Sequence, residues 1–79
     1  MSSTALLVRM ANDIGHFFRA EPQHAEAVAG VRSHIQRFWD PRMRKRIAAH
    51  LRSGGEGMEP LAREAVEGLA EFTAGAAAG

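Results

Sequence analysis

The sequence predicts an all-α fold, a small irregular bundle of about four short helices. Apolar residues recur at helical spacing in four segments, and no stretch of convincing length alternates with the period of two that is typical of a β-strand. Proline and glycine separate these segments. With 79 residues, the chain is short enough for a single domain. We expect this domain to cover residues 1–72 and a flexible Ala/Gly tail to cover residues 73–79.

The first predicted helix covers about residues 4–19, and Ser2, Ser3 or Thr4 can cap its start with a hydroxyl group. Its apolar residues recur at the i, i+3 and i+7 spacing of one helical face. They are Leu7, Met10, Ile14, Phe17 and Phe18. Pro22 ends this helix, because proline disfavours helical geometry at the preceding residue and suits the first turn of the next helix.

The second predicted helix covers about residues 22–39, and Trp39 lies beside its apolar line. The line consists of Val28, Val31, Ile35 and Phe38. Gly30 falls on the opposite side, where glycine costs up to about 1 kcal/mol relative to alanine. Asp40 and Pro41 predict that a new helix begins here, with Asp as the N-cap and Pro at the first helical position. We therefore expect a tight corner with the Phe-Trp pair just inside it.

The third predicted helix covers about residues 41–53. Its short apolar line consists of Met43, Ile47 and Leu51. Arg44 lies at the edge of this line, about 20° from Leu51 around the helix. The Ser-Gly-Gly sequence at 53–55 ends the helix, since glycine adopts left-handed backbone geometry at little cost.

The fourth predicted helix covers about residues 59–72 and begins near Pro60. One face carries Leu61, Ala65, Leu69 and Phe72. The other face carries Glu64, Glu67 and Glu71. Arg63 can pair with Glu67 at the i, i+4 spacing, and such a pair stabilises a helix by about 0.3 kcal/mol.

Basic residues concentrate between positions 32 and 52. This stretch carries seven of the ten basic residues and the only tryptophan against a single acid, Asp40. Residues 53–79 carry five acids and one basic residue, Arg63. Such asymmetry orients a protein on a partner, or one half of the chain on the other. If the chain binds a partner, residues 32–52 are where we expect it to bind.

The sequence lacks the common catalytic and metal-binding patterns. It has no cysteine, which excludes a disulfide framework, a thiolate metal site and a cysteine nucleophile, and which fits a cytosolic protein. The four histidines lack the i, i+4 pairing that places two metal ligands on one helical face. No pair of acids and no phosphate-binding loop indicates catalysis. We find neither a signal-peptide pattern nor an apolar run of about 18 residues that would cross a bilayer. We therefore predict no catalytic, cofactor-binding or metal site.

Four cations within positions 42–46 allow three interpretations. They form a solvated cationic face, they bind an acidic protein surface, or they contact the phosphates of a nucleic acid. The net charge of only +1 and the lack of a second basic helix weigh against nucleic acid, which remains the runner-up. The neighbouring Phe38 and Trp39 are simplest to explain as core residues, although tryptophan and arginine also dominate interface hot spots. The residues alone indicate a small helical interaction module.

The run HIQRFWDPRMRKRIAAHL at residues 34–51 resembles the signature of the delta subunit of cytoplasmic, molybdenum-containing, NAD-dependent formate dehydrogenases. That family opens with an LVRMAN-like segment and an IGxFF-like segment, here at 7–12 and 14–18. A Gly-containing loop at 54–57 and the Pro60-Leu61 opening of a last helix follow in the same order. The resemblance covers roughly residues 6–69 and leaves out the Ala/Gly tail.

The resemblance implies that this chain is a non-catalytic accessory subunit without a cofactor of its own. In that family, the alpha subunit is implied to hold a bis-molybdopterin guanine dinucleotide centre and to oxidise formate. The beta and gamma subunits are implied to pass electrons through FMN and iron–sulfur clusters to NAD. The delta subunit is linked to assembly or stability of the complex. It is alternatively a transient chaperone for cofactor insertion, in which case its arginines would meet the pyrophosphates of the cofactor.

Carried onto this sequence, the family motif gives a candidate contact surface for the partner subunits. It consists of His34, Phe38, Trp39, Pro41, Arg42, Met43 and Arg44, extended by the basic residues Lys45 and Arg46. An isolated subunit with apolar surface is also prone to self-association.

Overall fold

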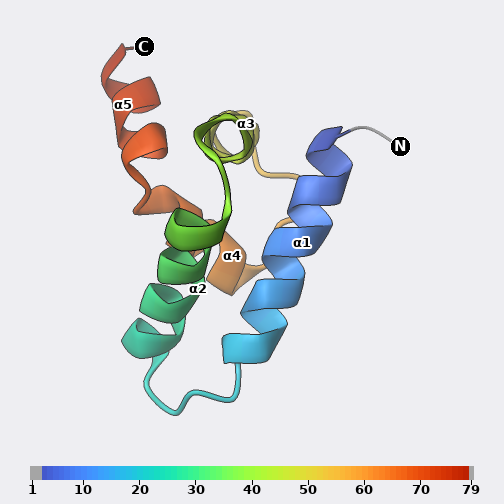
Figure 1. Ribbon diagram of the computed structural model, residues 1–79, viewed down its shortest axis with the longest axis vertical. Coiled ribbons are helices and arrows are strands. Elements are labelled where there is room, and N and C mark those ends of the chain that lie inside the picture. Colours follow the sequence, from blue (N-terminus) through green and yellow to red (C-terminus); the bar gives the residue numbers. More distant parts are fainter. Residues whose placement is uncertain (1–2, 79) are drawn as a thin grey trace.

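The computed structural model describes residues 3–78, which form five helices joined by turns and short loops. They are α1 (Ser3–Phe18), α2 (His24–Phe38), α3 (Pro41–Arg52), α4 (Pro60–Glu67) and α5 (Ala70–Ala78). No strand occurs within these residues, so the prediction of an all-α fold is confirmed. In Figure 1, α1 and α2 run side by side in opposite directions, and α4 lies between them and packs on both. α3 is seen nearly end-on above them, with α5 beside it.

The core lies where α1, α2, α3 and α4 meet. Its largest fully buried side chains are Ile35, Ile47, Leu69, Val31 and Val66. The contribution of α1 is a narrow stripe of Leu7, Ala11 and Gly15. Gly15 lies against α4, and a Cβ atom there would make an ordinary van der Waals contact with the Cβ of Leu61 at 3.5 Å.

The corner between α2 and α3 is built as the sequence predicts. The Asp40 side chain caps α3, where the backbone N–H of Met43 donates to Oδ1 over 2.9 Å. Pro41 occupies the first helical position. Trp39 leaves the helical conformation, with φ −93° and ψ 139°, and turns inward, so that it is 4% exposed. Phe38 is still helical and points outward, 69% exposed, so the prediction that both aromatic residues lie inside the corner is half wrong.

The predicted helix over 59–72 is two helices, because α4 ends at Glu67 and α5 begins at Ala70. The break lies at Gly68, against which the side chain of Arg32 packs. A Cβ atom at position 68 would lie 2.2 Å from the guanidinium carbon of Arg32. Arg32 donates to the last carbonyls of α4, through Nε to Ala65 at 3.1 Å and through Nη2 to Glu64 at 3.2 Å. Gly68 is the C-cap of α4, and a side chain from a different helix binds two of the last carbonyls.

Helix α5 continues to Ala78, beyond the predicted end at residue 72. Gly79 lies outside the described residues, as does Ser2, one of the three hydroxyl residues considered for capping the first helix. The flexibility expected of residues 73–79 stays a prediction.

The loop between α3 and α4 is held from both sides. As predicted, α3 ends in glycines with left-handed geometry, Gly54 with φ 121° and Gly55 with φ 66°. Arg63 donates to the carbonyls of both glycines, at 3.0 and 2.9 Å, so its predicted pairing with Glu67 is wrong. From α1, the Asn12 side chain donates to the Gly57 carbonyl at 2.8 Å and accepts from the Glu59 N–H at 2.9 Å.

Gly30 faces a neighbour and does not lie on an open side of α2. A Cβ atom at this position would lie 2.4 Å from the ring of Phe18, which is half-buried between α1 and α2. We expect Gly30→Ala to destabilise the protein, because overpacking costs about 1–3 kcal/mol and outweighs a helix-propensity gain of up to about 1 kcal/mol. Thermal unfolding checks this, with the exposed Ser33→Ala on the same helix as the control. A raised midpoint for Gly30→Ala would show that the ring moves aside freely.

Candidate functional site

Large apolar side chains are exposed on one side of the molecule. Leu6 is 48% exposed, Phe17 77% and Phe38 69%. Together with residues that line the hollows beside them, they define what we call the apolar face. It consists of Leu6, Met10 and Phe17 on α1, His34 and Phe38 on α2, and Met43 on α3. Exposed patches of this kind in a soluble protein mark interaction sites.

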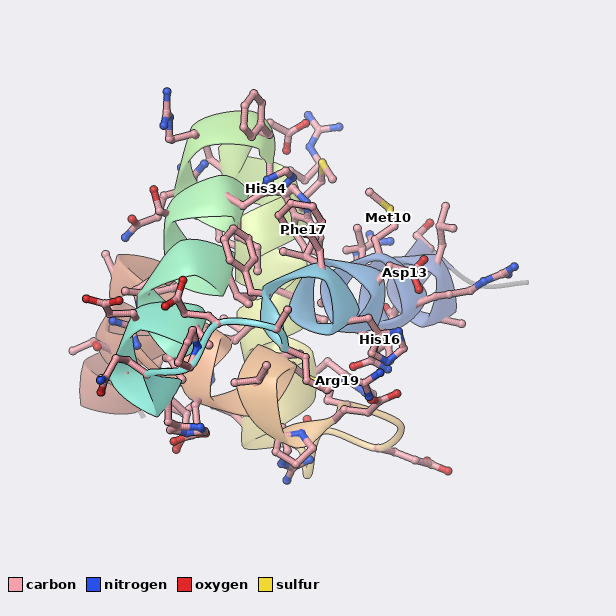
Figure 2. All side chains as sticks on the ribbon, turned by 90° about the horizontal axis from the view of Figure 1, so that it is seen from below. Met10, Asp13, His16, Phe17, Arg19 and His34 are labelled. Carbon is pink, nitrogen blue, oxygen red and sulfur yellow. The ribbon has the colours of Figure 1, made fainter. Side chains whose placement is uncertain are left out.

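The α1 part of the apolar face follows from helical spacing. Leu6, Met10 and Phe17 lie at i, i+4 and i+11, within a sector of about 40° around the helix. Figure 2 shows Met10 and Phe17 on the side of α1 that faces His34, whereas His16 and Arg19 lie on the other side.

Two shallow hollows connect α1 to its neighbours along this face. The first lies between α1 and α2 and is lined by Asp13, Ile14, Phe17, Phe18 and His34. The second lies between α1 and the start of α3 and is lined by Ser3, Leu6, Leu7, Met10, Arg42, Met43 and Arg46. The apolar face is therefore a strip along α1 with a hollow toward α2 at one end and a hollow toward α3 at the other.

Ring contacts order the aromatic part of the strip. The rings of His34 and Phe38 have centroids 4.7 Å apart, and the Arg37 guanidinium lies 5.9 Å from the Phe38 centroid. The Phe17 ring meets Phe18 edge-on at 5.1 Å. Such contacts hold the exposed rings in place before any partner arrives.

Exposed cations border the apolar face at the start of α3. Arg42, Lys45 and Arg46 are exposed, and none of them forms an ion pair with an acid among the described residues. Arg42 and Arg46 line the same hollow as Met43. These charges are therefore available to an acidic surface from outside the chain.

Arg44, in the middle of this basic run, is engaged inside the fold. Its Nε donates to Oε2 of Glu71 at 2.9 Å, and its Nη1 donates to the carbonyl of Trp39. The two side chains of the ion pair are only 18% and 17% exposed. Burial raises the pKa of Glu71, but the hydrogen bond and charge of Arg44 and the charge of Lys45 outweigh it, so the pKa lies below its ordinary value.

The structure separates the predicted contact residues into two groups. His34, Phe38, Arg42, Met43 and Arg46 lie on or beside the apolar face. Pro41 and Lys45 are exposed beside Arg42. Trp39 and Arg44 instead hold the fold together.

Sequence reasoning did not assign Leu6 or Phe17 to this surface. The available signal is the pairing of bulky neighbours, Leu6-Leu7 and Phe17-Phe18, since adjacent helical residues point about 100° apart and rarely both reach the core. Small residues at positions 11 and 15 mark the side of α1 that packs closest.

A third hollow, of about 340 Å³, lies between the α1–α2 turn and the start of α4. Two histidines that line or border it are paired with acids of α4 or its N-cap. His16 Nε2 lies 2.9 Å from Glu59 Oε1, and His24 Nε2 lies 2.7 Å from Glu64 Oε2. These pairs fasten α1 and α2 to α4. Within residues 3–78, no three His, Asp or Glu side chains come together as metal ligands would.

Comparison with known protein families matches residues 6–66 to the NADH-dependent formate dehydrogenase delta subunit family, FdsD. The chain belongs to this family. The match ends three residues before position 69, where the resemblance was expected to end. Every residue of the apolar face lies within the matched residues 6–66. Comparison with curated proteins and with solved structures gave no match. None of the helices in the described part of the chain has the length and apolar character needed to span a bilayer.

Proposed function

We propose that this chain is a non-catalytic accessory subunit of a cytoplasmic, molybdenum-dependent, NAD-linked formate dehydrogenase, and that it supports assembly or stability of the complex. Membership of the delta-subunit family carries the proposal. The exposed apolar face and its unpaired cations support it, because a small helical protein with such a surface is suited to binding another protein. The catalytic alpha subunit is the proposed partner, in a complex whose beta and gamma subunits hold the flavin and iron–sulfur clusters.

Purification of the tagged chain from its native host tests this function. We expect it to recover the alpha subunit in a stable ratio, with bound molybdenum and formate-dependent reduction of NAD. Recovery of no subunit of a formate dehydrogenase would contradict the proposal.

A second candidate function is that of a transient chaperone for insertion of the molybdenum cofactor. The observation that favours it is that Arg42 and Arg46 are exposed and form no ion pair among the described residues, because such cations also bind pyrophosphate. In this case, the tagged chain would recover only cofactor-poor alpha subunit, and the isolated chain would bind GDP. Titration of the chain with GDP, with Arg42→Ala/Arg46→Ala as the comparison, separates the two functions.

A further inference from the structure

We propose that the apolar face is the surface that docks on the formate dehydrogenase complex, and that its occupant is an apolar segment of a partner subunit flanked by acidic residues. This inference rests on the proposed function as an accessory subunit. It assigns the docking to one side of the molecule and gives the chemistry of what binds there.

The exposure of the side chains provides the first argument. Phe17 and Phe38 are the most exposed large apolar residues of the described chain, and both belong to this strip. The strip extends from Leu6 to Phe17, a distance of about 16 Å along α1 at the usual rise per residue. This length matches about three turns of a helical segment laid beside α1.

Charge provides the second argument. Arg42 and Arg46 border the strip at the start of α3, and Arg37 lies beside Phe38 at the end of α2, on the other side of the same corner. Asp13 is the one acid among the residues that line the two hollows of the strip. The surface is therefore apolar along α1 and positive on the side of the α2–α3 corner, which selects a partner segment that is apolar and carries acidic residues beside its apolar part.

A second copy of this chain fits the face poorly. A two-fold symmetric contact places the same patch on both sides of the interface. The cations of one copy would then approach those of the other, and the two acids nearby, Asp13 and Asp40, are fewer than the three arginines at positions 37, 42 and 46. Like charges facing each other disfavour association, so the charge pattern favours a different subunit.

The hollow beside the histidines is a weaker candidate for docking. His16 and His24 already have acidic partners within the chain. Arg42 and Arg46, which border the apolar face, form no ion pair among the described residues. An incoming acidic segment would meet Arg42 and Arg46 beside the apolar face, whereas the hollow offers Arg19 together with the acids Glu21 and Glu59.

Co-expression of tagged variants with the partner subunits tests the assignment. Phe17→Ser/Phe38→Ser removes the apolar centre, and Arg46→Glu reverses a charge at the rim. The matched control is Arg19→Glu, which reverses a charge on the opposite side of α1 (Figure 2). The amount of alpha subunit recovered per tagged chain is measured, and thermal unfolding verifies that each variant is folded.

We expect the double variant to reduce recovery of the alpha subunit at least about tenfold, as loss of interface hot spots does. Arg46→Glu should reduce it severalfold and most strongly at low salt, since salt screens exposed charges. Arg19→Glu should leave it unchanged.

The outcomes distinguish the inference from the proposed function. If the wild-type chain recovers no alpha subunit, the proposed function fails and the inference fails with it. If the wild-type and the folded double variant recover equal amounts, the function stands and the assigned face is wrong. If the double variant instead converts a dimer of the isolated chain to a monomer, with recovery unchanged, the face belongs to a second copy and the inference is overturned.

Discussion

Replacement of Trp39 with alanine is expected to lower the free energy of unfolding by about 3–5 kcal/mol. The side chain is 4% exposed and belongs to the central apolar cluster at the corner between α2 and α3. A domain of this size has a total stability of only about 4–12 kcal/mol, so the variant loses a large fraction of it, and its thermal midpoint should fall by about 12 °C or more. Thermal or denaturant unfolding of the isolated chain, followed by circular dichroism, measures the change.

Phe38→Ala is the matched control, because it truncates the adjacent aromatic residue. The Phe38 ring is 69% exposed, and truncation of such a side chain should change stability by no more than about 0.5 kcal/mol. Equal effects of the two variants would show that both rings contribute to the core, which contradicts the inward and outward arrangement. A loss of partner binding without a loss of stability is expected only for Phe38→Ala.

The ends of the first three helices were predictable to within a few residues because local chemistry decides them. Pro22, the Asp40-Pro41 pair and the glycines after α3 act through their own backbone preferences, and the structure confirms each boundary approximately. The break at Gly68 was not predictable in this way, because Arg32 from α2 helps to end α4. A contact between residues 32 and 68 leaves no local signal in the sequence.

The candidate site was predictable in its charge and less so in its apolar part. Helical periodicity identified α1 as amphipathic, but it placed Phe17 and Phe18 on one face. In the structure, the Phe18 ring packs against Gly30, whereas the Phe17 ring is exposed to solvent. Likewise, the basic run was recognised, but only tertiary structure shows that Arg44 faces an acid from α5. The direction in which a borderline residue points depends on the partner helix, which a single helical wheel does not contain.

Reversal of the charge at Arg44 is expected to lower the free energy of unfolding by about 2–3 kcal/mol. Arg44→Glu removes the hydrogen bonds to Glu71 and to the Trp39 carbonyl, and it places two acids together where each side chain was less than one fifth exposed. Removing one partner of a fully buried ion pair destabilises a protein by about 3–5 kcal/mol, and the loss here should be smaller because water still reaches the site. The thermal midpoint should fall by about 8 °C or more.

Arg46→Glu provides the control for this change, since it reverses the same kind of charge on the same helix without an internal partner. Its stability should stay within about 0.5 kcal/mol of the wild type. The exchanged pair Arg44→Glu/Glu71→Arg should recover part of the loss, as coupled neighbours do in a double-mutant cycle. Absence of any recovery would show that the ion pair itself contributes little.

The pH dependence of stability should report the same ion pair. The pKa of Glu71 is lower in the folded protein than its ordinary value of 4.5, so its contribution is present above that value and is lost as pH falls through the folded pKa. The stability difference between wild type and Glu71→Gln should therefore shrink as pH is lowered below about 4.5.

Because Arg44 acts on the fold and Arg46 has no ion pair among the described residues, Arg44→Glu should weaken partner binding mainly through unfolding, and Arg46→Glu should weaken it in a fully folded chain. A binding defect in Arg44→Glu without any loss of stability would instead return Arg44 to the contact surface.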